Sequence, residues 1–348
     1  MPAKLQTAVM GATGYSGFEL TRLLLHHPRV AAPLLLRRQE SAGKQSNLAE
    51  MFPAISGNGS YPLEPFSWEI LQQHGVKLLF LATPHETSRS LVPEAIARGL
   101  RIVDLSGAWR LKDEQHRAVY GFKDEDAATA ADLTQKAIYG LPELNGASIP
   151  GAALVANPGC YATSIILALA PLVKAKIVDH KKGIISDSKS GVSGAGKEPT
   201  AKTHFVSVAD NLSAYAVFGH RHLGEILEQL NIHSSEFIFT PHLLPIPRGI
   251  LSTIYVHLNR EMKSAEVESC FRQFYAGRRW VRIFPTPQLP QIQYSVYSNY
   301  CDIGFCLAAD GRRLVIVSCI DNLLKGAAGQ AVQNMNLMYG WEEGEGLQ

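Results

Sequence analysis

A single cysteine stands where a short apolar strand is expected to give way to a helix. Cys160 follows the turn residues Pro158 and Gly159, and the apolar residues after it recur at helical spacing. The first N–H groups of a helix lack intrahelical acceptors, and the helix dipole favours negative charge there. Because such a position lowers a cysteine pKa from about 8.5 toward neutrality, Cys160 is a candidate nucleophile. The competing interpretation is a small buried residue at a strand–helix junction.

Two histidines farther along the chain could supply acid–base chemistry. The stretch Gly219-His220-Arg221-His222 is expected to be extended, which would place both rings on one face. The pair would also suit zinc, but no third ligand stands at a recognisable spacing, so we predict no metal site. We expect one histidine to act as general acid and base while the other positions it. The alternative is that both cap the helix that follows.

A glycine-rich stretch near the N-terminus has the residue types of a phosphate-binding turn. It lies between a strand expected at 5–10 and a helix, and a second apolar strand is expected at 30–36. Strand, glycine turn, helix and strand open a dinucleotide-binding fold, whose glycines let the backbone approach a pyrophosphate at the helix N-terminus. The spacing is G-x-x-G-x-x-G, and a purely structural turn is the alternative. The candidate cofactor contacts are Gly11, Thr13, Gly14, Tyr15, Ser16 and Gly17.

The residues after the second strand favour NADP over NAD. A unit that binds NAD places Asp or Glu there to bind the ribose hydroxyls. This chain instead has Arg37, Arg38 and Ser41, whose cationic and hydroxyl groups suit a 2′-phosphate, although Glu40 lies among them. We therefore predict NADP(H) as the cofactor. The alternative for the two arginines is a solvated loop.

Two further arginines occupy positions where an anionic substrate could be held. Arg110 follows a strand expected at 101–105, and the carboxyl ends of strands line the ligand crevice of a doubly wound sheet. Arg248 stands in the rigid turn Pro245–Gly249, before another strand. A guanidinium group forms forked, charge-assisted pairs with carboxylates and phosphates. An ordinary surface position is the alternative for each.

The stretch 191–197 fits the phosphate-binding pattern G-x-x-x-x-G-K but lacks its context. Glu198 stands where Ser or Thr would bind Mg²⁺, and Pro199 disfavours a helix start. We therefore reject a nucleotide triphosphatase. A flexible glycine-rich loop beside the nicotinamide or the substrate is expected instead.

Composition places these groups in an ordinary globular protein. The 348 residues, of which 46% are apolar and 18% charged, suffice for two domains with cores. The net charge of +2 favours neither nucleic-acid nor membrane binding. No signal segment or membrane-spanning apolar run is evident. The five cysteines form no CxxC pair, which favours free thiols in a reducing cytoplasm.

The pattern of strands and helices predicts two domains of different architecture. Alternating strands and helices up to residue 159 predict a Rossmann-like, doubly wound α/β domain. From residue 160 to 319, longer strands joined by loops predict a mixed-sheet α+β domain, and the segment 320–348 is expected to complete the first domain. The other expected elements are strands at 76–82, 153–156, 183–188, 237–242, 252–258, 302–309 and 314–320, and helices at 83–98 and 264–275.

These motifs together resemble the N-acetyl-gamma-glutamyl-phosphate reductase family of arginine biosynthesis. The resemblance covers nearly the whole chain, and the cysteine motif is its most specific part. Departures stand at Ser164, where the family usually has Gly or Ala, and at Gly224, where Pro is common. The matching segments are GATGYSG at 11–17, DLSGAWRL at 104–111, ANPGCYATS at 156–164, SGVSGAGK at 190–197, GHRHLGEI at 219–226, LPIPRGIL at 244–251 and DNLLKGAAGQA at 321–331.

The resemblance implies reductive dephosphorylation of an acyl phosphate on a fold like that of glyceraldehyde-3-phosphate dehydrogenase. Cys160 would form a thioester, hydride from NADPH would reduce it to N-acetylglutamate 5-semialdehyde, and the family motif selects His220 as the acid–base residue. The first domain would bind NADP, and the second would carry catalysis and the contacts of a homodimer or homotetramer. The implied substrate contacts are Arg110, Asn157, Lys197, His222 and Arg248, and the further cofactor contacts are Ser190, Gly191 and Asn322.

Three rival functions remain at this stage. Aspartate-semialdehyde dehydrogenase performs the same chemistry on a shorter substrate, but its pattern places a histidine just after the arginine–glycine turn, where this chain has Ile250 and Leu251. The acyl-phosphate reductases of lysine synthesis act on a substrate that differs by one methylene group. The non-catalytic rival is an NADP-sensing module in which Cys160 is inert.

Overall fold

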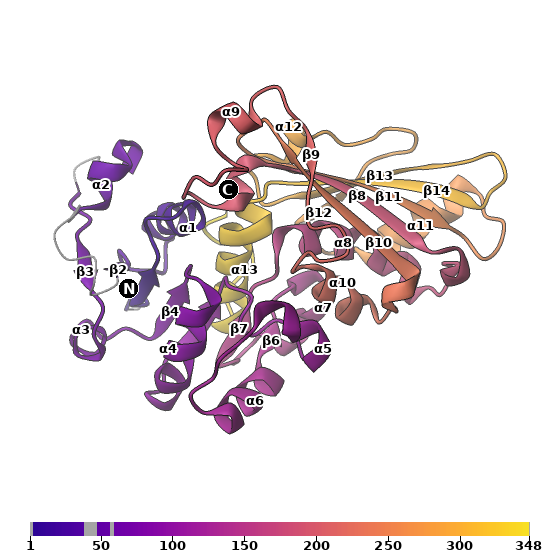
Figure 1. The fold of residues 1–348 in the computed structure, drawn as a ribbon. Helices are drawn as coiled ribbons and strands as arrows, with labels where there is room; N and C mark the ends of the chain where they lie inside the picture. The colour runs from indigo at the N-terminus through magenta and orange to yellow at the C-terminus, as the bar shows by residue number, and fades with distance from the viewer. Residues whose placement is uncertain (1–2, 38–46, 56–58, 348) are drawn as a thin grey trace. The chain divides into compact units, whose positions relative to one another are not determined.

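A computed structural model describes residues 3–37, 47–55 and 59–347. The chain divides into two compact units. Unit 1 comprises Met1–Lys112, Tyr120–Asn157 and Ala327–Gln348, and unit 2 comprises Asp113–Val119 and Pro158–Gly326. Each unit is built on one sheet (Figure 1). Within the described residues, no helix has the length and apolar character needed to cross a membrane.

Unit 1 contains a parallel sheet with the strand order β3-β2-β1-β4-β5-β7-β6. Its central strands β1 and β4 are short apolar runs buried on both faces, as expected where helices cover both sides of a parallel sheet. The strands are β1 (Thr7–Met10), β2 (Leu34–Arg37), β3 (Leu63–Pro65), β4 (Leu78–Leu81), β5 (Arg101–Asp104), β6 (Ile138–Tyr139) and β7 (Leu154–Ala156).

The turn after β1 is packed too tightly for side chains at two of its glycines. Gly11 has φ +91°, and a Cβ atom there would lie 2.3 Å from the carbonyl oxygen of Ala82, just after β4. A Cβ atom on Gly17 would lie 2.1 Å from the carbonyl oxygen of Gly11. The order of the strands reverses between β1 and β4, and in doubly wound sheets ligands bind at this switch point.

The helices of unit 1 include the C-terminal one. Helices α1 and α13 pack against each other, and His27 at the end of α1 bonds the Asn336 side chain of α13 at 3.0 Å. The α4 helix packs on β5 and on α6. The helices are α1 (Tyr15–Leu25), α2 (Leu48–Met51), α3 (Trp68–Gln73), α4 (His85–Ala97), α6 (Ala127–Lys136), α7 (Pro142–Asn145) and α13 (Gly329–Met338).

Unit 2 contains a mixed sheet with the strand order β12-β13-β14-β11-β8-β10-β9. The pairs β12–β13 and β8–β10 are parallel and the other pairs are antiparallel. The strands are β8 (Ile184–Gly191), β9 (Ser213–Ala214), β10 (Phe237–Leu244), β11 (Ile250–His257), β12 (Val281–Ile283), β13 (Cys301–Leu307) and β14 (Arg313–Ile320), and the helices are α5 (Glu114–Arg117), α8 (Cys160–Lys174), α9 (Phe205–Val208), α10 (Leu223–Leu230), α11 (Ser264–Phe274) and α12 (Ile292–Ser295).

Helix α8, which begins at Cys160, is anchored to this sheet by hydroxyl groups as well as by apolar packing. Ser188, Ser252 and Ser318 are directly paired across β8, β11 and β14 and are wholly buried. Ser164, one turn after Cys160, lies within hydrogen-bond distance of Ser252 (3.0 Å) and Ser318 (3.1 Å) through its hydroxyl. Small side chains let the helix approach the sheet, and the mutual hydrogen bonds satisfy polar groups that burial would otherwise make costly.

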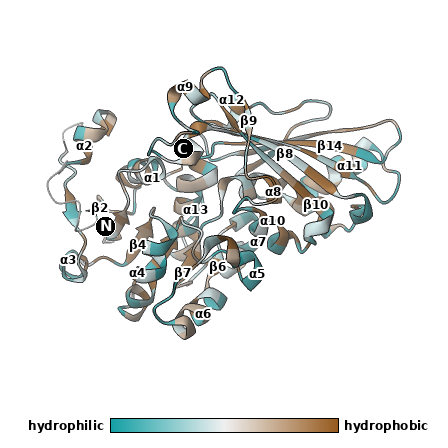
Figure 2. Ribbon diagram, in the orientation of Figure 1, coloured by the Kyte–Doolittle hydropathy of each residue, from teal (hydrophilic) through white to brown (hydrophobic). Residues whose placement is uncertain are grey.

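Helices pack on one face of the mixed sheet, whereas the other face is exposed at several apolar residues. Helices α8, α10 and α11 lie along one face (Figure 1). On the other face Ile185, Ile238 and Tyr255 are 41–43% exposed and occupy directly paired positions on three adjacent strands. Figure 2 shows brown, apolar segments on these strands. This side of unit 2 therefore presents an apolar row to its surroundings.

The structure confirms both predicted architectures, the doubly wound α/β unit and the mixed-sheet α+β unit. The second strand begins at Leu34 instead of residue 30, because Val30 forms only an isolated bridge with Leu5. The short strands β3, β6, β9 and β12 were absent from the sequence prediction, since two or three residues show no measurable period.

Candidate active site

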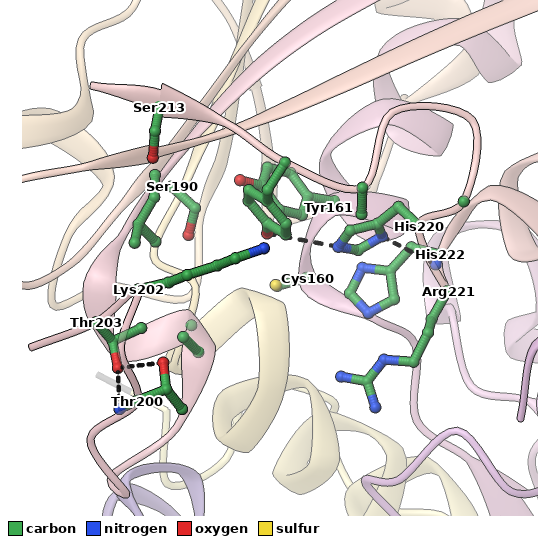
Figure 3. Close-up of a pocket in the computed structure, with 16 residues that line it drawn as sticks. Cys160, Tyr161, Ser190, Thr200, Lys202, Thr203, Ser213, His220, Arg221 and His222 are labelled. Carbon is green, nitrogen blue, oxygen red and sulfur yellow. Dashed lines mark hydrogen bonds between the residues drawn. The ribbon is translucent and has the colours of Figure 1, made fainter. Parts of the chain in front are cut away.

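Cys160 is the first residue of α8 and opens into a cavity of unit 2. Gly159 precedes it in an extended conformation and no side chain caps the helix, so the first-turn N–H groups remain available to other acceptors. The cavity has a volume of about 330 Å³, within the range of small-molecule sites. The chemically active groups that line it are Cys160, Tyr161, Ser190, Lys202, Tyr215, His220, Arg221 and His222 (Figure 3).

Three groups pack closely on the N-terminal end of α8. The wholly buried Glu225 of α10 accepts a hydrogen bond from the backbone N–H of Gly159 at 2.9 Å. The His222 ring lies over Gly159, where a Cβ atom would come within 2.4 Å of Nε2. A Cβ atom on Gly326 would come within 2.7 Å of the Cys160 Cβ. These contacts hold the cysteine in place, and sequence reasoning missed Glu225 and Gly326 because neither carries a local signal of this role.

His220 sits in an aromatic enclosure that keeps its ring neutral. The rings of Tyr161, Tyr215, Phe239 and His222 all lie within 5.6 Å of it, centroid to centroid. Burial, with a smaller contribution from the charge of Arg221, lowers the pKa of His220 to about 4. The ring is therefore uncharged at neutral pH.

A backbone hydrogen bond assigns the tautomer of this neutral ring. The N–H of His222 donates to Nδ1 of His220 at 3.1 Å, so the ring proton lies on Nε2. Nε2 faces the hydroxyl group of Tyr215 at 3.5 Å. His220 is thus a hydrogen-bond donor within the cavity. The segment 219–222 forms a turn before α10, and the extended conformation predicted for it is wrong.

Two tyrosines beside Cys160 remain protonated. Burial raises the pKa of Tyr161 far above its usual range, and burial also raises the pKa of Tyr215 to about 12. The Tyr161 hydroxyl donates to the carbonyl oxygen of His242 at 2.8 Å, which fixes its ring against the two histidines. Neither tyrosine was predicted as a site residue, because aromatic residues at such positions read as core.

Arg110 and Asn157, predicted substrate contacts, are brought together in unit 1. Arg110 is 6% exposed and donates to the carbonyl oxygens of Asn157 (2.8 Å) and Leu105 (2.7 Å). The Asn157 amide donates to the carbonyl oxygen of Ala327 and accepts from Asn334. These hydrogen bonds fix the backbone that leads to Cys160.

Arg248 and Asn322 tie together loops of unit 2. The Arg248 guanidinium pairs with Asp321, which is wholly buried, and stacks over Tyr297. Asn322 accepts from the Gly249 N–H at 2.7 Å and donates to the Ser193 hydroxyl at 2.9 Å. Both side chains thereby hold the glycine-rich loop beside the start of β11.

The glycine-rich loop contributes to the cavity through other residues than its lysine. Ser190 lines the cavity, and a Cβ atom on Gly191 would lie 2.7 Å from the backbone nitrogen of Arg248. Val192–Ala195 forms a 3₁₀ turn. Lys197 is exposed and does not line the cavity, whereas Lys202, which sequence reasoning passed over, does.

The glycine turn of unit 1 fits a dinucleotide cofactor. Gly11 and Gly17 leave no space for side chains, as a backbone that closely approaches a phosphate requires. The buried hydroxyl of Thr83, after β4, and the Nη1 group of Arg37, at the end of β2, have no hydrogen-bond partner among the described residues. A bound ligand with phosphate and ribose oxygens would satisfy both. Thr13, Gly14, Tyr15 and Ser16 lie in this turn, while Arg38 and Ser41 lie outside the described residues.

A metal centre finds no support in the part of the chain that the structure describes. No group of three or more His, Cys, Asp or Glu side chains there is placed to hold an ion. All five cysteines are free thiols.

Comparisons with known proteins place the whole chain in one family. Residues 6–152 match the family model "Semialdehyde dehydrogenase, NAD binding domain", and residues 160–322 match "Semialdehyde dehydrogenase, dimerisation domain". The N-acetyl-gamma-glutamyl-phosphate reductase of Desulfotalea psychrophila is 44% identical over 99% of this chain and 98% of its own length. That of Methanocaldococcus jannaschii is 42% identical over 98% and 97%.

Solved structures show the same fold at lower sequence identity. Aspartate semialdehyde dehydrogenase II of Vibrio cholerae superposes with a TM-score of 0.71 at 18% identity, covering 96% of this chain and 98% of that one. A probable aspartate-semialdehyde dehydrogenase of Pseudomonas aeruginosa gives 0.68 at 21% identity, with the same coverage. With a cysteine-headed helix in a histidine-lined cavity and relatives above 40% identity along its full length, the chain belongs to the N-acetyl-gamma-glutamyl-phosphate reductase family of semialdehyde dehydrogenases.

Proposed function

We propose that this protein catalyses the NADPH-dependent reductive dephosphorylation of N-acetyl-gamma-glutamyl phosphate to N-acetylglutamate 5-semialdehyde, a step of arginine biosynthesis. The observation that carries the proposal is the placement of Cys160 at the uncapped N-terminus of α8, inside a cavity lined by histidine, tyrosine and cationic side chains. The full-length family relationship supports the choice of substrate. The five free thiols suit a reducing compartment, and we propose the cytoplasm.

Unit 1 is the proposed dinucleotide-binding unit. The turn at Gly11–Gly17 would hold the pyrophosphate, and Arg37 would face the 2′-phosphate that distinguishes NADP. When bound, NADPH supplies the hydride that reduces the acyl group carried by the enzyme. The chain's own residues bind and orient the reactants around this transfer.

Acyl transfer to sulfur is the first chemical step. The Cys160 thiolate attacks the acyl carbon, the sulfur–carbon bond forms, and the carbon–oxygen bond to phosphate breaks with its electron pair leaving on phosphate. The N–H groups of the first turn of α8 lie at the same helix end as the sulfur, so they can bind the oxyanion of the tetrahedral intermediate. Phosphate takes up the proton that balances the overall reaction.

We propose for His220 the role of a neutral hydrogen-bond donor, which is narrower than the general acid–base role expected from the sequence. Its neutral ring, protonated on Nε2, donates a hydrogen bond without carrying charge. We assign this donor to the substrate oxygen in the two tetrahedral intermediates, before and after reduction. Collapse of the second intermediate expels the thiolate and releases the aldehyde without further proton transfer. His222, packed on Gly159, would hold the backbone of the helix start in position.

Unit 2 is also the proposed subunit-contact unit. Ile185, Ile238 and Tyr255 form an exposed apolar row across β8, β10 and β11. A second copy of the chain would remove this row from water, which supports a homodimer through the uncovered face of the sheet. Tyr255→Glu should give a monomer in sedimentation analysis, and a variant that sediments like the wild type would contradict this contact.

A substrate-discriminating assay tests the proposed function directly. In the oxidative direction, NADP reduction should require both inorganic phosphate and N-acetylglutamate 5-semialdehyde. Aspartate 4-semialdehyde serves as the matched control, because it carries the same aldehyde on a shorter chain. A kcat/KM with aspartate semialdehyde equal to or above that with the acetylated substrate would refute the assignment.

A further inference from the structure

The active-site cavity carries positive charge that no acidic side chain neutralises. Its lining contains Lys202 and Arg221 but no aspartate or glutamate. Among the described residues, neither cation forms a hydrogen bond or an ion pair with another side chain. The anionic substrate of the proposed reaction is the natural complement of this charge.

The two arginines predicted as substrate contacts, and Lys189 of the neighbouring strand, are engaged within the protein. Arg248 pairs with the buried Asp321, and Arg110 donates to two backbone carbonyl groups. Lys189, on β8, pairs with Asp187 at 2.8 Å. Lys202 therefore differs from them in having its ammonium group uncommitted beside the nucleophile.

Lys202 lies in a turn that is closed by hydrogen bonds between its own residues and that lines the cavity. The Thr200 N–H donates to the Thr203 hydroxyl at 2.8 Å, and the His204 N–H donates to the Thr200 carbonyl oxygen at 2.8 Å. Thr200 and Thr203 line the cavity together with Lys202. Figure 3 shows the Lys202 side chain extended toward the Cys160 sulfur, with Arg221 on the other side of that sulfur. The turn is thus closed by its own hydrogen bonds, and Lys202 is its charged cavity-lining residue.

We propose that Lys202 binds the phosphate group of the acyl phosphate, and the phosphate ion in the reverse reaction. This inference rests on the proposed function for the identity of the substrate. The phosphate is bonded through one oxygen to the carbon that Cys160 attacks, whereas the substrate carboxylate lies at the far end of the carbon chain. A cation directed at the sulfur therefore meets the phosphate first. As the carbon–oxygen bond breaks, the leaving phosphate gains negative charge, which the Lys202 ammonium stabilises.

Protection of Cys160 by inorganic phosphate tests the assignment without turnover. The rate of iodoacetamide alkylation of Cys160 is measured against phosphate concentration in the wild type, Lys202→Gln, Lys202→Arg and Lys197→Gln. We expect phosphate to slow alkylation in the wild type, and Lys202→Gln to raise the half-protecting concentration by roughly tenfold to a hundredfold, the range for a lost charge-assisted hydrogen bond. Lys202→Arg keeps the charge and should recover most of the protection. Lys197→Gln, on the same segment but outside the cavity, should change protection less than Lys202→Gln.

Steady-state kinetics in the oxidative direction gives the second readout. Lys202→Gln should raise the KM for phosphate far more than the KM for the semialdehyde, which carries no phosphate.

Equal protection in Lys202→Gln and the wild type, or a larger effect of Lys197→Gln, would overturn the proposal. If phosphate protection depends on Lys202 while N-acetylglutamate semialdehyde is not oxidised, the proposed function fails and the anion site stands. If the semialdehyde is oxidised and Lys202→Gln leaves the phosphate KM unchanged, the function stands and the anion site fails.

Discussion

Two helix N-termini, one in each unit, share the same backbone arrangement but have different residues around them. Helix α1 begins after Gly14 and helix α8 after Gly159, and both glycines are extended, with φ −80° and −72°. Neither helix has a side-chain cap or an acidic residue in its first turn. Each therefore directs its first-turn N–H groups and the positive end of its dipole toward a site that suits an anion.

What stands around each helix start sets its chemistry. Before α1 the backbone itself fills the space, because Gly11 and Gly17 leave no room for a Cβ atom, which lets the backbone approach a ligand closely. At α8 the first helical residue is Cys160, and Glu225, His222 and Gly326 pack around it. We therefore propose that the start of α1 holds a cofactor phosphate and that the start of α8 holds a covalent nucleophile, and that the first residue and its neighbours set this difference.

Replacing the Cys160 sulfur should have the largest effect, because it should abolish turnover at the α8 start while leaving cofactor binding at the α1 start intact. Cys160→Ser should lower kcat by at least about a thousandfold, because a hydroxyl is a far weaker nucleophile than a thiolate. NADPH affinity, measured by fluorescence titration, should stay within about twofold of the wild type. Loss of NADPH binding together with turnover would show that the two sites are not separable.

The role of His220 is tested by replacing its donor. His220→Ala should lower kcat by about a hundredfold, the range for one oxyanion donor. His220→Gln keeps an N–H donor of similar reach and should retain more activity than His220→Ala. Equal losses in the two variants would favour a proton-shuttling histidine over a neutral donor.

The pH behaviour of the same ring follows from its lowered pKa. The His220 imidazole should titrate near pH 4 by ¹⁵N NMR. Because the unfolded chain takes up this proton near pH 6.5 and the folded protein does not, His220 contributes full stability above pH 6.5 and loses it as the pH falls toward 4. In His220→Gln the free energy of unfolding should fall less steeply over this interval. A folded-state midpoint near 6.5 would contradict the burial argument.

Crowding the first helix start should impair the cofactor site. In Gly17→Ala the new Cβ atom would lie 2.1 Å from the carbonyl oxygen of Gly11, so the turn must open. We expect NADPH affinity to fall at least about tenfold and thermal stability to decrease. The alkylation rate of Cys160 should change little, and a matching loss at Cys160 would count against independent helix starts.

Crowding the second helix start gives the reciprocal experiment. In Gly159→Ala the added Cβ atom would meet the His222 ring at 2.4 Å, and the ring must move. We expect kcat to fall by about tenfold, because small displacements at a reacting centre cost one to two orders of magnitude. NADPH affinity should be preserved. Wild-type kcat in this variant would mean that the His222 contact does not position the nucleophile.

The smallest effect is expected at the cofactor's 2′-phosphate. Arg37 pairs with the carbonyl oxygen of Leu63 through Nε, which leaves Nη1 without a partner. Arg37→Gln should raise the KM for NADPH about threefold to tenfold, as for a partly solvated charge, and leave that for NADH unchanged. An equal rise for both cofactors would assign Arg37 to the fold alone.

The helix starts themselves were predictable from the sequence. Strand, glycine turn and helix are local signals, so the turn at 11–17 and the cysteine at 160 were located, and the doubly wound and mixed-sheet architectures followed from the order of apolar runs. Boundaries were less accurate where pairing decides them, as at Val30, which joins Leu5 in a single bridge.

Only the tertiary structure determined which residues surround Cys160. Glu225, Gly326, Tyr215 and Lys202 reach the cysteine or its cavity from segments distant along the chain, and no residue type or spacing announces such a meeting. Arg248 shows the opposite case. From the sequence it was predicted to bind the substrate, but in the fold its guanidinium group pairs with the buried Asp321. Local sequence determined where a nucleophile could stand, since helix starts and tight turns depend on neighbouring residues. Long-range packing determined which cationic side chains near Cys160 form no ion pair within the protein, since pairing and burial depend on residues that only the fold brings together.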